Sequence, residues 1–305
     1  MRKARVTVPA VATNLGPGIH SLGLALGLHL TVTFVERNDS TLIIESHGEG
    51  SADLSSDGYH PVMRAAMRVF QRIEEAPIGL RLDVRNTIPL DVGLGAEAAM
   101  TVAGLMGANN LMGMPLGRDE LLALGAELLG RADGLVAAML GGLTVADSRG
   151  RGVVYRRVEI APLKVLVVLP EIVTFDPAEL RLPESVAFEE ALHNIGRHAL
   201  LVEALREGDF EQLSHVLADP LIDPLIARRV PGYKLAVEAA RKAGALGITF
   251  SGNGPAILVF ALFNHYRIAD AMQRVFDERG ILSRVWTLPV DLQGVVVAVA
   301  EMHPD

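Results

Sequence analysis

The chain has 305 residues, 50% of them hydrophobic, and a formal net charge of −8 at pH 7. This length predicts one large or two ordinary domains with a substantial core. The acidic balance and the lack of a basic run argue against nucleic-acid binding. The absence of cysteine excludes disulfides, thiol catalysis and thiolate metal sites. The sequence has no apolar run of ~20 residues and no signal-peptide pattern, so we expect a soluble cytoplasmic protein without membrane contact.

Strands and helices are both predicted in the first half of the chain. Apolar alternation predicts strands over Arg5 to Val8, Leu30 to Val35, Leu42 to Glu45 and Leu80 to Val84. Helical periodicity predicts helices over Val62 to Ile73, Ala98 to Asn109, Asp119 to Leu129 and Val136 to Leu140. A short strand over Val153 to Tyr155 follows.

The second half opens with a continuous apolar run, Leu163 to Pro170, that predicts a buried strand. Helices are predicted over Phe188 to Arg206, Asp209 to Leu217, Tyr233 to Ala243 and Tyr266 to Arg279, and strands over Ile257 to Ala261 and Gly294 to Ala300. Strands and helices do not alternate strictly, which favours an α+β fold. The predicted join divides the chain into domains of residues 1–158 and 159–305.

Three glycine-containing segments stand out as candidate sites. They are "PAVATNLGPGIHSLGLAL" (Pro9 to Leu26), "IPLDVGLGAEAA" (Ile88 to Ala99) and "AGALGITFSGNGPAILVF" (Ala243 to Phe260). The second places a glycine turn before a helix, where free backbone N–H groups and the helix dipole attract phosphate. Each segment alone is also explained by turns or tight packing, because glycine serves both.

In this order and spacing, the three segments resemble the GHMP family of small-molecule kinases, and within it the homoserine kinases. The resemblance extends to "GRADGLVAAMLGGLT" (Gly130 to Thr144) and "VPGY" (Val230 to Tyr233). It implies an N-terminal domain like ribosomal protein S5 and a ferredoxin-like C-terminal domain, with ATP and a small-molecule acceptor in the cleft between them. The implied reaction transfers the γ-phosphoryl group of ATP to the hydroxyl of homoserine with magnesium. The resemblance also suggests a homodimer.

The resemblance assigns roles to individual residues. The phosphate loop corresponds to Gly93, Gly95, Ala96 and Glu97, and a second nucleotide-binding turn to Ser251, Gly252 and Gly254. Glu127 falls close to the family's magnesium glutamate, and Asp133 matches a family aspartate, so both are catalytic candidates and Glu127 is the metal candidate.

The phosphate loop departs from the family pattern at two positions. Ala96 and Glu97 replace two serines whose hydroxyls the family uses toward phosphate and magnesium. Two unit charges ~4 Å apart repel by about 4 kcal/mol at an effective dielectric near 20, so Glu97 is expected to weaken ATP binding. Alternatively, Glu97 ligates magnesium itself or points away as a helix-stabilising carboxylate.

The implied homoserine pocket also changes its charges. Asn14 is kept, whereas His20 replaces the aspartate that holds the amino group and Arg131 replaces a histidine. Glu179 and Ile226 stand where the family has arginines that grip the carboxylate. An imidazole does not replace a carboxylate opposite an ammonium group.

Two further observations leave the alignment open. Arg181, Arg228 and Arg229 lie near the two lost arginine positions, so a shifted register would restore one of them. His60 stands where an asparagine often helps to hold the nucleotide in this family.

Three hypotheses follow. The first is a homoserine-kinase-like protein with degraded ATP, magnesium and homoserine sites that binds, senses or assembles rather than catalyses. The second is an active homoserine kinase in which Glu97, Glu127 and Asp133 hold the metal. The third is an enzyme that uses His20, Arg131 and Asp133 on another small molecule.

Overall fold

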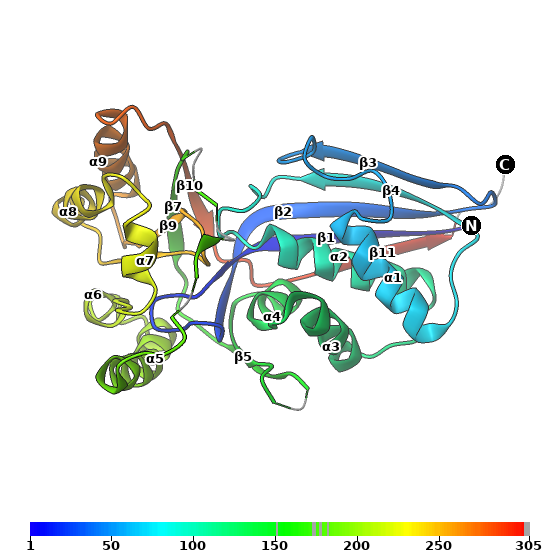
Figure 1. The fold of residues 1–305 in the computed structure, drawn as a ribbon, viewed down its shortest axis with the longest axis horizontal. Helices are drawn as coiled ribbons and strands as arrows, with labels where there is room; N and C mark the ends of the chain where they lie inside the picture. Colours follow the sequence, from blue (N-terminus) through cyan, green and yellow to red (C-terminus); the bar gives the residue numbers. More distant parts are fainter. Residues whose placement is uncertain (151, 173–174, 177–178, 182, 302–305) are drawn as a thin grey trace.

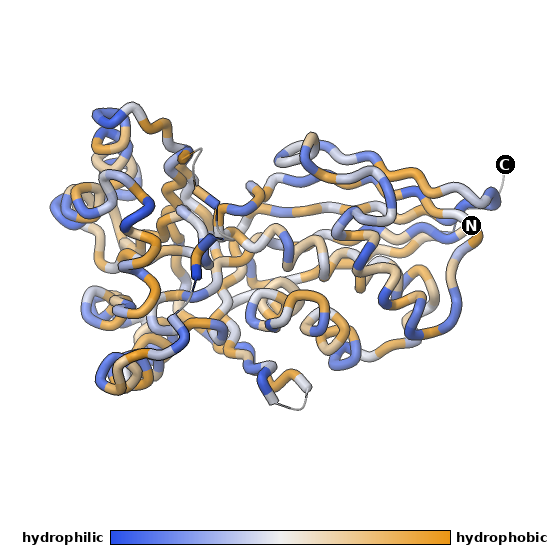
Figure 2. The backbone as a smooth tube through the Cα atoms, viewed as in Figure 1, coloured by the Kyte–Doolittle hydropathy of each residue, from blue (hydrophilic) through white to orange (hydrophobic). Residues whose placement is uncertain are grey.

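The computed structural model describes residues 1–150, 152–172, 175–176, 179–181 and 183–301, which form two β-sheets with helices packed on them. Figure 1 shows the first sheet and its helices on one side of the molecule and the second sheet with its helices on the other. Hydrophobic residues recur along the strands of both sheets (Figure 2), as expected of cores built on sheet faces. No helix in the described ranges is long and apolar enough to cross a membrane.

The first sheet has the strand order β11-β1-β2-β4-β3, and β5 and β6 continue it from β2. Its strands are β1 (Arg2–Thr13), β2 (Leu22–Arg37), β3 (Leu42–Gly48), β4 (Gly79–Asn86), β5 (Leu143–Asp147), β6 (Val154–Val158) and β11 (Val296–Glu301). β1 and β2 extend well beyond their predicted ranges. The C-terminal extension of β1, residues 9–13, is buried on both faces, so it carries no apolar alternation to mark it as a strand.

Four helices lie on one face of the first sheet (Figure 1). They are α1 (Pro61–Ile73), α2 (Ala96–Leu111), α3 (Arg118–Leu129) and α4 (Asp133–Leu140). Helix α2 contacts β1, β2 and the three other helices, so it is buried along nearly its whole length. Val102 and Leu105 are fully buried on α2.

The second sheet is antiparallel, with the order β10-β7-β9-β8. Its strands are β7 (Lys164–Pro170), β8 (Gly247–Phe250), β9 (Ile257–Phe260) and β10 (Ser283–Pro289). The helices of this half are α5 (Phe188–Glu207), α6 (Leu213–Val216), α7 (Asp223–Ala227), α8 (Tyr233–Ala243) and α9 (His265–Asp277). The chain order and strand order are ferredoxin-like, which confirms the predicted α+β fold class.

Strand β7 is buried on both faces, as its continuous apolar run predicted. Val165, Val167 and Leu169 join the core cluster that also contains the first sheet. Leu166 and Val168 join a second cluster built with α8 and α9. One strand therefore contributes to both hydrophobic clusters.

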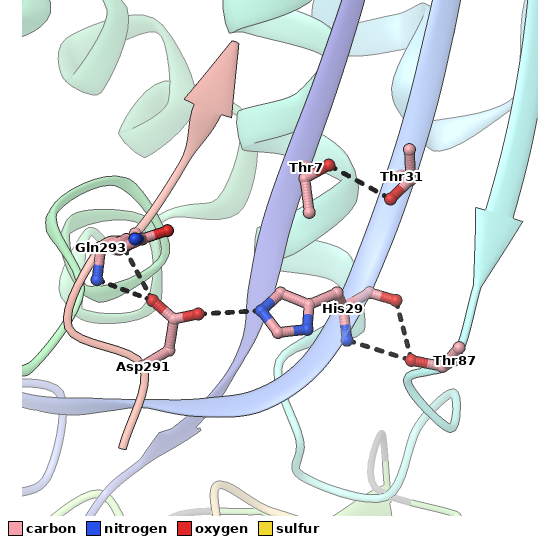
Figure 3. Close-up of polar contacts among 7 residues, drawn as sticks. Thr7, His29, Thr31, Thr87, Asp291 and Gln293 are labelled. Atoms are coloured by element: carbon pink, nitrogen blue, oxygen red, sulfur yellow. Dashed lines mark hydrogen bonds and ion pairs between the residues drawn. The ribbon is translucent and has the colours of Figure 1, made fainter. Parts of the chain in front are cut away.

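The chain passes between the two sheets twice. Residues 159–163 lead from β6 to β7, and residues 290–295 lead from β10 back to β11, which pairs with β1. Asp291 fixes the second passage to β2 by accepting a hydrogen bond from His29 at 2.8 Å (Figure 3). Asp291 also accepts a hydrogen bond from the backbone N–H of Gln293 within the passage. The division at residues 158/159 stays a prediction, and the pairing places β11 in the first sheet.

One predicted helix is wrong in extent. Residues 209–217 contain only the single-turn α6, because Asp209 turns the chain by accepting a hydrogen bond from the N–H of Gln212. Strands β5, β8 and β10 and helix α7 were not predicted.

Candidate functional site

The three glycine segments meet at one place. The segment after β1, the loop before α2 and the turn between β8 and β9 are joined by backbone contacts. The N–H of Gly252 donates to the carbonyl of Thr13 at 2.7 Å, and the hydroxyl of Ser251 donates to the carbonyl of Gly93 at 2.6 Å. Loops from both halves of the chain therefore form a single site.

Two glycines are required for this close approach. A Cβ on Gly93, which has a φ of +91°, would lie 1.9 Å from the carbonyl oxygen of Ser251. A Cβ on Gly254 would lie 2.0 Å from the carbonyl carbon of Val92. Because no side chain fits at these distances, Gly93 and Gly254 are explained by packing between the loops, whatever they bind.

Helix α2 begins at Ala96, directly after Gly95 and two residues before its predicted start. No side chain caps this end, and the first N–H to find a helical partner is that of Ala99, which donates to Gly95 at 2.9 Å. The preceding N–H groups lack intrahelical acceptors, as in any helix, and give this end a positive potential. Glu97 is exposed in this first turn and has no hydrogen-bond or ion-pair partner among the described residues.

A cavity of about 390 Å³ lies against this helix end. Its walls come from both halves of the chain: Thr13, His20, Asp91, Gly93, Gly95, Ala96, Glu97, Ala98, Leu129, Arg131, Gly134, Leu135, Gly252, Asn253 and Gly254. The predicted residues His20, Arg131 and Glu97 therefore share one cavity with Gly93 and Gly95 of the predicted phosphate loop. Thr13, Asp91 and Leu129 were not predicted to belong to it.

Asn14 and His20 define the first loop of the site. Both have a positive φ, 53° and 52°. The side-chain oxygen of Asn14 accepts from the N–H of His20 at 2.9 Å, and its amide donates to Asn253 at 3.1 Å. Burial, followed by the charge of Arg131, lowers the pKa of His20, so its imidazole is neutral at pH 7.

Arg131 and Asp133 form an ion pair beside the cavity. The Arg131 Nε atom is 3.5 Å from Asp133 Oδ1, and the Asp133 side chain is fully buried. Neither carboxylate oxygen of Asp133 has a hydrogen-bond partner among the described residues. Arg131 also donates to the hydroxyl of Thr13 at 3.4 Å, which holds the guanidinium at the cavity wall.

The remaining residues of the predicted homoserine pocket lie outside this cavity. Glu179 is exposed and ion-paired with Arg229 at 2.7 Å, and the guanidinium of Arg229 also lies over the ring of Phe175. Ile226 is fully buried in the second hydrophobic cluster. The cavity therefore contains His20 and Arg131 but neither Glu179 nor Ile226.

The described residues do not assemble the magnesium ligands that the resemblance implies. Glu127 is exposed on α3 and does not line the cavity. Asp133 lies beside Arg131, whose positive charge competes with a metal cation. One group of three potential ligands exists in the described part of the chain, Glu45, His47 and Asp83, and it lies on β3 and β4 away from the cavity.

Comparison with known proteins identifies the family. Residues 61–142 match the GHMP kinases N terminal domain, and residues 201–280 match the GHMP kinases C terminal domain. The chain is 36% identical to a homoserine kinase of Moorella thermoacetica over 294 residues, covering 96% of this chain and 99% of that protein. The chain belongs to the GHMP kinase family. A homoserine kinase of Carboxydothermus hydrogenoformans is 35% identical, over 90% of this chain and 88% of its own length.

Solved GHMP kinase structures agree with the fold. A homoserine kinase from Cytophaga hutchinsonii has a TM-score of 0.86 and 26% identity, covering 97% of both chains. A putative homoserine kinase from Listeria monocytogenes has a TM-score of 0.79 and 26% identity, covering 97% of this chain and 99% of its own. This member of the GHMP kinase family is therefore homoserine-kinase-like over almost its whole length.

Proposed function

We propose that this chain is a homoserine-kinase-like protein that binds Mg-ATP and homoserine weakly and is not an efficient homoserine kinase. In this proposal the cavity takes a small anion or a neutral hydrogen-bonding molecule instead. The main support is Glu97, an unpaired carboxylate in the first turn of α2 that lines the cavity where the resemblance implies a phosphate-binding hydroxyl. Asp91 adds a second carboxylate to the same wall.

The electrostatic effect of Glu97 can be bounded. Repulsion between two unit charges ~4 Å apart is about 1 kcal/mol in bulk water and about 4 kcal/mol at an effective dielectric of 20. These energies weaken binding by roughly fivefold to a thousandfold. The uncapped end of α2 and Arg131 still favour one negative charge, which is why a small anion suits the cavity better than a triphosphate.

The test is calorimetric titration of the full chain with Mg-ATP. We expect a millimolar or weaker dissociation constant, and a combined Ala96→Ser and Glu97→Ser variant should bind more tightly by roughly fivefold to a thousandfold. Glu238→Ser is the matched control, because it removes the same charge from an exposed helix residue outside the cavity. A micromolar dissociation constant for the unmodified chain would overturn the proposal.

The second candidate is an active homoserine kinase with an unusual metal site. Its support is the 36% identity to a homoserine kinase over 96% of the chain, together with the buried, hydrogen-bond-free oxygens of Asp133. The third is a GHMP enzyme acting on another small molecule through His20, Arg131 and Asp133. A homodimer, a cytoplasmic location and the two-domain division stay predictions under all three.

A further inference from the structure

A second cavity lies where the chain passes between the two sheets. Its volume is about 630 Å³, and it shares no lining residue with the candidate site. Residues 160–163 of the first passage and Val290 and Leu292 of the second line it. We call it the hinge cavity. Its size is within the range of small-molecule sites, roughly 300–1,000 Å³.

The walls of the hinge cavity are largely apolar. Phe210, Phe260 and Leu262 from the second half of the chain face the aliphatic residues of the two passages. No acidic side chain is among its lining residues. Asp291 lies between Val290 and Leu292, but its carboxylate is bound to His29 and to backbone N–H groups (Figure 3).

Two features give this apolar cavity a positive end. Lys164, at the start of β7, is exposed and has no ion-pair partner among the described residues. His265 is the first residue of α9, and no side chain caps this helix end, so the helix dipole adds positive potential there.

We propose that the hinge cavity is a binding site for a small apolar molecule with one carboxylate. The hydrocarbon part fills the space between the two passages, and the carboxylate accepts a hydrogen bond from Lys164 at the start of β7. Apolar walls with a few convergent polar groups are the usual composition of a small-molecule site. A ligand there touches both passages and therefore fixes the relative position of the two sheets.

Octanoate is the probe, titrated into the full chain by calorimetry, with 1-octanol and octylamine as comparison ligands. We expect octanoate to bind most tightly and octylamine not at all. Across hexanoate, heptanoate and octanoate, each added methylene should strengthen binding roughly fourfold, since about 0.8 kcal/mol accompanies each buried CH₂. No octanoate binding at millimolar concentration, or equal binding of all three eight-carbon probes, would overturn the proposal.

Variants locate the site. Lys164→Gln should weaken octanoate binding at least fivefold and leave 1-octanol unchanged, whereas Lys242→Gln, at an exposed lysine of α8 outside the cavity, should change neither. Leu262→Glu should abolish octanoate binding. Leu282→Glu, also at an exposed leucine but outside the lining, should not. These positions are exposed, so the variants should fold, and equal behaviour of either pair would refute the assignment.

Discussion

His60 stands where the resemblance implies a nucleotide contact, but its ring is used inside the protein. It is fully buried at the start of α1, where Nδ1 accepts from the N–H of Val62 at 3.1 Å. Its Nε2 lies 3.3 Å from the hydroxyl of Ser46. His60 therefore caps a helix, a role usually taken by Ser, Thr, Asp or Asn.

This cap predicts a pH dependence of stability. Burial lowers the pKa of His60 below its value in the unfolded chain, about 6.5, so the unfolded state binds the proton more readily. The stability that His60 contributes is therefore present above that pH and is lost as pH falls through the lowered pKa. We expect His60→Asn to reduce the loss of unfolding free energy between about pH 7.5 and pH 5.5, measured by urea titration.

The control for this prediction is His47→Asn, because His47 is a mostly exposed histidine on β3. It should leave the pH dependence close to that of the unmodified chain. If His60→Asn loses as much stability on acidification as the unmodified chain, the assignment of His60 as a pH-sensitive cap is incorrect.

Residue identities alone predicted part of the site. His20, Arg131 and Glu97 were expected from motif positions, and all three line one cavity. Asp91 was missed because a single acid in a loop has no characteristic spacing, although its φ of 56° marks it as a special backbone position. The location of Ile226 in the core depends on the packing of the second sheet, which no local pattern encodes.

The site depends on the packing of the turn between β8 and β9 against the loop before α2. The carbonyl of Val92 accepts from the N–H of Ala256 at 3.2 Å, next to the Ser251 contact with Gly93. Strand β8 has only four residues, too few to show a period, so this turn was recognised by its glycines and not by its strands.

A pair of glycine variants tests this packing. Gly93 and Gly113 have similar φ values, 91° and 85°, but a Cβ on Gly113 meets no atom within 4 Å. Gly113→Ala should therefore cost only the strain of a left-handed alanine, about 1–2 kcal/mol. Gly93→Ala should cost at least about 1 kcal/mol more, because of overpacking against Ser251. Equal losses of unfolding free energy in urea would show that the two loops do not pack tightly in solution.

Two passages of the chain join the two sheets of the molecule. The sequence predicted the first passage, because the apolar run of β7 marks a new buried strand. It did not predict the return, since the pairing of β11 with β1 is a contact between the two ends of the chain. Arg284 of β10 adds a further link by its ion pairs with Glu49, at 2.6 Å, and Glu171, at 3.2 Å.

Both halves of the chain form the candidate site, because residues of the first sheet's loops and of the β8–β9 turn line its cavity. The fold of the GHMP kinase family is therefore present in both halves of the chain. We propose that the side chains at the cavity, above all Glu97 and His20, decide which molecules this protein binds.

The most direct measurement is the turnover of homoserine by the full chain with millimolar Mg-ATP, followed by ADP release and by phosphorus NMR of the product. The homoserine kinase of Moorella thermoacetica serves as the positive control. Ordinary enzymes turn over on the order of 1 s⁻¹ or more. We predict turnover far below that rate, because the charge of Glu97 repels the triphosphate and the neutral His20 offers no negative charge to the ammonium group of homoserine. Turnover of homoserine on that ordinary scale would contradict the account.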